Sequence, residues 1–307
     1  MLELLWSMTF RPYVTLFLLG FLALSSLEQG WLRTVIWLVS GYLVAFLAEY
    51  CSTQVNGIPF GWYVYNYNAL ENDLMVMGVP FFDSLSFSFL SYVSFSFAQF
   101  FMSTFWFDRH DVQRVTPRRV RNSAFVLLLG TTLMVVIDII VDPLAHLGRY
   151  WFLGDIYYYP DPGHHFSVPL ANYAGWFAVG WVVIFLNQRI DAALSTLEQK
   201  RGKPVQLRHL PFKGVFAPLF WAGIVLFQLG VTYWLGWSGV IEPEAKTLGD
   251  ANLITMVRLQ AYTGTFIVVP ILLLALAHLL RPAGRAQRAD LQEWLEEYPC
   301  AKLQQRN

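Results

Sequence analysis

The sequence predicts an all-α fold, a polytopic integral membrane bundle of about seven transmembrane helices. Hydrophobic residues make up 56% of the 307-residue chain and charged residues only 14%, whereas soluble domains carry roughly 25% charged residues. The charged residues lie in short segments between long apolar stretches. Soluble, disordered, collagen-like and coiled-coil chains are therefore excluded.

Seven stretches are predicted to span the bilayer, because each approaches the roughly 20 mostly apolar residues that a spanning helix needs. In chain order they cover residues 12–27, 31–48, 84–107, 122–142, 169–187, 214–237 and 253–280. The third contains the alternating run Ser84-Leu85-Ser86-Phe87-Ser88-Phe89, which is typical of a strand. A lone strand in lipid leaves its backbone groups unsatisfied, so we expect a helix with Ser84, Ser88 and Ser91 on one face.

Basic residues are concentrated in alternate loops and thereby predict the orientation. One side holds Arg33, the arginines from Arg109 to Arg121, the basic residues from Arg189 to Lys213 and those from Arg281 to Arg306. The other side holds only Arg11, Arg149, Lys246 and Arg258. The positive-inside bias then puts the amino terminus outside and the carboxyl terminus in the cytoplasm, in a bacterial-type cytoplasmic membrane.

Residues 1–283 are expected to form one bundle domain, and residues 284–307 a cytoplasmic amphipathic tail. In the tail, Leu291, Trp294, Leu295 and Tyr298 repeat at helical spacing between glutamates. Such a helix either lies on the membrane surface or packs on the loops of the protein. The pattern itself leaves both open.

Several kinds of site have no support in the sequence. The formal net charge is zero, which gives no indication of a nucleic-acid partner. The adjacent His164 and His165 lack the spacing of a helical metal site, and two cysteines are too few for one, so no metal is expected. A phosphate-binding glycine loop, a GxSxG motif and a CxxC motif do not occur.

The strongest candidates for chemistry are Asp138 and Asp142, near the outer end of the fourth predicted helix. Their spacing of four residues puts both carboxylates on one helix face. Ionisable groups at membrane depth are costly and are therefore functional candidates. Pro143 predicts that the helix ends at Asp142. The alternative is that one aspartate pairs with Arg258 or Arg149 while the other bonds to backbone groups.

Two further carboxylates lie at helix ends on the same side of the membrane. Glu49 closes the second predicted helix, and Asp83 opens the third, after Gly78-Val79-Pro80. Asp83 with Ser84 has a competing interpretation as an ordinary N-cap, which satisfies free backbone donors. Both acids are kept as candidate catalytic residues.

Aromatic residues are abundant in the outward-facing segments. Most are expected to form the belt that is common at membrane interfaces, while some line a tunnel for a long, flat, apolar substrate and stabilise a cation. The candidate substrate-binding residues are Trp62, Tyr63, Tyr65, Trp151, Asn172, Tyr173 and Trp176.

At these segments the sequence resembles the carotenoid biosynthesis membrane-protein family that includes carotenoid 1,2-hydratases of the bisanhydrobacterioruberin and gamma-carotene type. The resemblance covers roughly residues 45–180. It rests on Glu49, the GIPFGWYVY run from Gly57 to Tyr65, Gly78-Val79-Pro80, Asp138 to Pro143, Trp151 to Pro160 and the FSVPLANYAGW run from Phe166 to Trp176. Ser167 and Ile137 depart from the family pattern, which leaves the substrate end group open.

The resemblance implies cofactor-free addition of water to the terminal double bond of an acyclic carotenoid, giving a tertiary alcohol. Such a reaction needs an acid to protonate the alkene and a second carboxylate to hold the water that captures the cation. We expect Asp138 or Asp142 as the acid, the other or Glu49 as the water holder, and Asn172 and Tyr173 as orienting groups. Two alternatives stay open, a cyclase that uses the same protonation and a membrane protein that binds a carotenoid or lipid without altering it.

Overall fold

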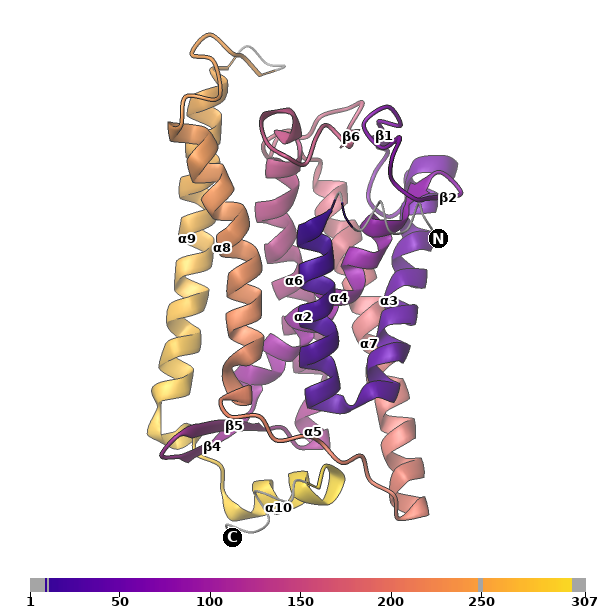
Figure 1. The fold of residues 1–307 in the computed structure, drawn as a ribbon, viewed down its shortest axis with the longest axis vertical. Helices are drawn as coiled ribbons and strands as arrows, with labels where there is room; N and C mark the ends of the chain where they lie inside the picture. Colours follow the sequence, from indigo (N-terminus) through magenta and orange to yellow (C-terminus); the bar gives the residue numbers. More distant parts are fainter. Residues whose placement is uncertain (1–8, 10, 248–250, 300–307) are drawn as a thin grey trace.

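The computed structural model describes residues 9, 11–247 and 251–299. Within these residues, seven helices are long and apolar enough to cross a membrane, which confirms the predicted fold class. They stand side by side along the long axis of the molecule (Figure 1). These helices are α2 (Pro12–Gln29), α3 (Trp31–Tyr50), α4 (Phe81–Met102), α6 (Ala124–Ala145), α7 (Leu170–Arg201), α8 (Phe216–Trp237) and α9 (Leu253–Leu280).

The predicted ends of the third and fifth spans differ most from the structure, because hydropathy reports apolar composition and not backbone conformation. Helix α4 ends at Met102, and the apolar residues that follow it form the strand β4 (Thr104–Asp108), which pairs with β5 (Asp111–Val115) in a hairpin. Helix α7 continues past residue 187 to Arg201, where a left-handed Gly202 ends it. The residues of these added turns are largely polar, so hydropathy does not mark them as part of a membrane span.

Helix α4 is the central element of the bundle, and its Ser/Phe run is helical as predicted. It contacts α2, α3, α6, α7 and α8, and 83% of its span is buried inside the protein. Small serines let the neighbouring helices approach closely. A Cβ atom on Gly41 of α3, for example, would lie only 2.9 Å from the Cα atom of Ser88. The alternation of serine and phenylalanine therefore reflects a helix that is covered on all sides.

Short strands connect the loops at one end of the bundle, which we call the aromatic end. There β1 (Val64–Tyr65) pairs with β6 (Tyr157–Tyr158), and β2 (Met75–Val76) pairs with β3 (Val79–Pro80). The pairing of Tyr65 with Tyr157 joins two loops that are far apart in the sequence. The single turns η1 (Cys51–Val55) and η2 (Gly148–Tyr150) also lie in these loops.

The opposite end, which we call the basic end, carries the β4–β5 hairpin and the helices α5 (Arg118–Arg121) and α10 (Arg288–Glu297) (Figure 1). The turns η3 (Lys213–Val215) and η4 (Pro282–Gly284) precede α8 and α10. The four apolar tail residues from Leu291 to Tyr298 are buried against Val115 and Leu207. Of the two arrangements left open by the sequence, the described part of the tail therefore adopts packing on the loops.

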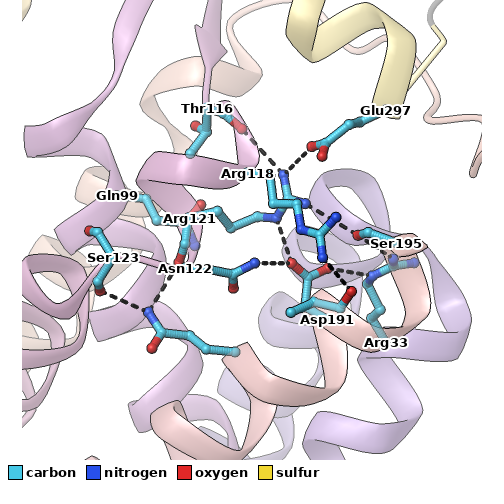
Figure 2. Close-up of polar contacts among 12 residues, drawn as sticks. Arg33, Gln99, Thr116, Arg118, Arg121, Asn122, Ser123, Asp191, Ser195 and Glu297 are labelled. Atoms are coloured by element: carbon cyan, nitrogen blue, oxygen red, sulfur yellow. Dashed lines mark hydrogen bonds and ion pairs between the residues drawn. The ribbon is translucent and has the colours of Figure 1, made fainter. Parts of the chain in front are cut away.

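A buried network of ion pairs holds the basic end together. Figure 2 shows Asp191 of α7 between the guanidinium groups of Arg33 and Arg121. The Nε atoms of the two arginines lie 2.7 and 2.9 Å from the carboxylate oxygens. Glu297 of α10 accepts from Nη1 of Arg121 at 3.0 Å, and Glu198 accepts from Arg33. In this network each cation has an anionic partner, as buried charges require.

Candidate active site

The four carboxylates predicted from the sequence come together around two adjoining cavities near the aromatic end. Glu49, Asp83 and Asp142 line the first, the polar cavity, of about 50 Å³. Asp83, Asp138 and Asp142 line the second, the apolar cavity, of about 110 Å³. The cavities adjoin because Asp83, Asp142, Tyr157 and Trp176 line both.

Asp142 accepts three hydrogen bonds. It lies in the last turn of α6, which continues past Pro143 to Ala145 instead of ending at Asp142 as predicted. Tyr157 donates to Oδ1, while Tyr159 and Asn172 donate to Oδ2 at 3.0 and 2.9 Å. The two tyrosines reach the same carboxylate because residues two apart in an extended segment point the same way.

Asp138, one turn earlier on α6, has a different environment. Its Oδ2 atom accepts from Nδ2 of Asn172 at 2.7 Å, so Asn172 joins the two aspartates. Its Oδ1 atom is buried and has no hydrogen-bond partner within the described residues. The whole residue is only 1% exposed. One oxygen of Asp138 therefore has no donor within the described residues, and the residue lines the apolar cavity.

Glu49 and Asp83 are held by hydroxyl groups. Ser84 donates to Oε2 of Glu49, and the Tyr65 hydroxyl donates to Oδ2 of Asp83 at 2.7 Å. The N-cap interpretation of Asp83 was wrong, because α4 begins at Phe81 and Asp83 lies inside its first turn. The Asp83 side chain instead accepts a hydrogen bond from Tyr65 and lines the polar cavity.

None of the four carboxylates forms an ion pair within the described part of the chain, which sets this cluster apart from the network at the basic end. The two arginines considered as partners for the aspartate pair are engaged elsewhere. Arg149 pairs with Asp155 at 3.1 Å, and Arg258 donates to the Gly236 carbonyl at 2.9 Å. The alternative, in which one of the two aspartates pairs with Arg149 or Arg258, is therefore wrong.

Aromatic side chains form much of the cavity walls. Trp176 stacks on Phe87 with 4.3 Å between ring centroids. Tyr63 packs edge-on against Tyr157, with centroids 5.7 Å apart. Burial, and then the nearby carboxylates, raise the pKa values of Tyr63 and Tyr159 well above their usual range. Their hydroxyl groups therefore stay protonated and act as donors.

The predicted substrate-binding residues divide into two groups. Tyr63, Trp151, Asn172 and Trp176 line one or both cavities, and Tyr65 supports them through its bond to Asp83. Trp62 is 49% exposed and lines neither cavity. Tyr173 lines neither cavity and places its hydroxyl 2.5 Å from Nδ1 of His165.

Three residues of the site were missed by the sequence analysis. Tyr157 and Tyr159 were not among the candidate substrate-binding residues, although their spacing of two in an extended loop points both hydroxyls to one side. Gln228 of α8 lines the apolar cavity and is 5% exposed. The sequence feature that could have indicated Gln228 is a single amide side chain within a mostly apolar span.

A surface cleft of about 470 Å³ adjoins the site at the aromatic end. Tyr157 and Tyr159 line both this cleft and the polar cavity and so form the wall between them. His146 packs on the cleft side of this wall, with ring centroids 5.2 Å from Tyr157 and 5.1 Å from Tyr159. Burial lowers the pKa of His146 to about 4, so the imidazole is neutral at physiological pH.

Comparison with protein families gives a match to the model of the carotenoid biosynthesis protein family over residues 10–241. The match covers well over half of the chain and includes every residue of both cavities. The chain belongs to the carotenoid biosynthesis protein family. Comparison with curated proteins and with solved structures finds no match. Family membership confirms the resemblance seen in the sequence and assigns this integral membrane protein a role in carotenoid biosynthesis.

Proposed function

We propose that this member of the family is a carotenoid hydratase, which adds water to the terminal C1,2 double bond of an acyclic end group. The observation that carries the proposal is the unequal hydrogen bonding of Asp138 and Asp142 in one apolar cavity. Two carboxyl groups in different environments are what an acid-catalysed hydration requires.

Asp138 is the proposed acid. Its Oδ2 atom accepts from Asn172, which leaves Oδ1 to carry the proton toward the alkene. Protonation of the less substituted carbon leaves a tertiary cation on the other carbon. Apolar walls exclude bulk water at this stage and protect the cation from uncontrolled attack.

Asp142 is the proposed anion. Three donors satisfy its oxygen atoms and favour the ionised form. Its negative charge and the stacked faces of Phe87 and Trp176 stabilise the cation. Glu49 and Asp83 offer further acceptors for water in the polar cavity. The water that captures the cation releases a proton to Asp138. Asp138 is then protonated again and Asp142 is still ionised, as at the start of the reaction.

The apolar cavity also suggests the route of the substrate. It extends from the aspartates to Phe17 of α2 and Ile224 of α8. Only 28% of the α2 span is buried inside the protein, and its apolar residues Leu16 and Leu19 are exposed on the outside of the bundle. A carotenoid dissolved in the bilayer therefore enters laterally, between helices, with its end group leading.

The test is pigment analysis in a lycopene-producing host that expresses Asp138→Asn or Asp142→Asn. Loss of a general acid costs about 10²- to 10⁴-fold in rate, so Asp138→Asn is expected to abolish the hydrated product. Asp142→Asn removes the charge near the cation and is expected to reduce the product at least tenfold. Asp161→Asn, in an exposed loop at the same end, serves as the matched control and retains activity.

The products also separate this proposal from its rivals. A hydratase adds the mass of one water, a cyclase gives a ring without oxygen, and a binding protein leaves the pigment unaltered. Unchanged hydrated product in both aspartate variants would show that the acid lies elsewhere.

A further inference from the structure

A buried glutamine on α8 faces the same cavity as the proposed acid. Gln228 lies in the apolar span of α8 and lines the apolar cavity together with Asp138 and Asp142. It was not among the residues singled out from the sequence. Because it comes from a different helix than the aspartates, its position in this cavity is an independent observation.

The amide oxygen of Gln228 needs a donor. Its Oε1 atom is buried and has no hydrogen-bond partner among the described residues, and the same holds for Oδ1 of Asp138. Buried polar atoms are nearly always hydrogen-bonded, either to protein or to ordered water. A water molecule carries two hydrogens.

A purely structural role for Gln228 is not required by the packing of α8. The Trp221 indole donates to the Leu133 carbonyl at 3.3 Å and so joins α8 to α6. The Tyr233 hydroxyl lies 2.8 Å from Oγ1 of Thr265 and joins α8 to α9. These contacts anchor α8 on both sides without the Gln228 side chain.

We propose that Gln228 positions the reacting water. Its amide oxygen accepts a hydrogen bond from the water. The oxygen atom of this water then forms a bond to the tertiary cation. As the new carbon–oxygen bond forms, the other hydrogen leaves as a proton and passes to the Asp138 carboxylate, which had given its own proton to the alkene. This inference rests on the proposed hydratase function and names the group that decides the fate of the cation.

The expected consequence of losing Gln228 is a change of product and not a loss of protonation. Without a held water, the cation returns a proton to Asp138 and reverts to the alkene. In heavy water this futile cycle places deuterium in the recovered, unhydrated carotenoid. Deuterium in the recovered substrate therefore reports the acid step separately from the capture step.

The experiment compares Gln228→Met, Gln228→Glu and Gln260→Met in membranes supplied with an acyclic carotenoid in heavy water. Gln260 is a buried glutamine of α9 that lines the surface cleft instead of the apolar cavity, and it is the matched control. Gln228→Met is expected to lose at least tenfold in hydrated product and to gain deuterium in the recovered carotenoid. Gln228→Glu keeps an oxygen at the same reach and retains hydration, as does Gln260→Met.

Each other outcome overturns the role of Gln228. Hydration by Gln228→Met at the wild-type level, equal losses in Gln228→Met and Gln260→Met, or loss in both Gln228 variants would each do so while leaving the hydratase function intact. A wild-type protein that forms no hydrated product would overturn the hydratase function, and this role with it.

Discussion

Two aspartates of one helix face show how a few neighbouring donors differentiate identical side chains. Asp138 and Asp142 are separated by one turn and share Asn172. Tyr157 and Tyr159 reach only the second of them. The local sequence around the pair predicts their common face, but the donors come from a loop whose fold depends on its pairing with β1.

His146 gives a prediction for the dependence of stability on pH. Burial holds the pKa of its imidazole at about 4 in the folded protein, against 6.5 for the free side chain. The unfolded chain therefore takes up a proton at a pH where the folded protein does not, so stability falls as the pH drops from 6.5 toward 4. The total loss from this group is on the order of 3 kcal/mol.

The prediction is checked by thermal unfolding of His146→Phe in detergent across this range of pH. Phenylalanine keeps a ring against Tyr157 and Tyr159 but does not titrate, so the variant is expected to lose less stability than the wild type on acidification. His164→Asn removes an exposed histidine of the same end and is expected to follow the wild type. If the stability of His146→Phe and of the wild type fell equally with pH, His146 would not be the group responsible for the acid-induced loss of stability.

Carboxylates within apolar spans are conspicuous in a sequence, and for this reason Glu49, Asp83, Asp138 and Asp142 were all predicted. Tyr157, Tyr159 and Gln228 were not, because tyrosines near a membrane boundary and a single amide in a span are also common in proteins without such a site. Trp62 and Tyr173 illustrate the reverse case. Both lie within motifs of the family resemblance, yet neither lines one of the two cavities.

At the scale of the elements, close contact between α7 and the Gly57–Tyr65 segment shapes the polar cavity. A Cβ atom on Gly175 would lie 2.5 Å from Cδ1 and 2.8 Å from Cα of Phe60. Phe60 is 2% exposed and lines the polar cavity. The contact with Phe60 Cα involves backbone, so it cannot be relieved by rotating a side chain.

Gly175→Ala is therefore expected to destabilise the protein by about 1–3 kcal/mol, the usual cost of overpacking, and to reduce pigment conversion as the cavity wall moves. Gly223→Ala in α8 is the matched control, since a Cβ there meets no atom within 4 Å. Alanine at that position favours the helix by about 1 kcal/mol. Equal melting temperatures for the two variants would show that the contact between Gly175 and Phe60 can accommodate a Cβ atom without loss of stability.

The helices themselves were largely predictable, since each span is marked by its apolar composition. The helix ends were less so. The residues from Thr104 to Phe107 were predicted to continue α4 because three of the four are large and aromatic, whereas in the structure they pair with β5 as a strand. Beyond residue 187, α7 continues for reasons that hydropathy does not record, among them the bonds of Asp191 to Arg33 and Arg121.

At the scale of the whole molecule, the orientation in the membrane stays a prediction. Most basic residues lie at the end that carries β4, β5 and α10, so this end is expected in the cytoplasm. Two of them, Arg33 and Arg121, also hold the ion-pair network together. Arg33 and Arg121 are thus part of the charge pattern that predicts the orientation and also part of a buried ion-pair network.

Thiol labelling of intact cells checks the orientation. In a background in which Cys51 and Cys300 are replaced by serine, single cysteines are introduced as Tyr158→Cys at the aromatic end and Lys203→Cys at the basic end, both exposed positions. A membrane-impermeant reagent is expected to label the first in intact cells and the second only after lysis. The reverse pattern would invert the molecule and place the site in the cytoplasmic half.

The basic-end network has a consequence for how the protein is made. Its members come from α3, α5, α7 and α10, so the bond between Arg121 and Glu297 is formed only after the ribosome has released residue 297. Every residue assigned to the two cavities lies at or before Gln228. During synthesis, all residues that line the two cavities are therefore translated before the ion pair between Arg121 and Glu297 can form at the opposite end.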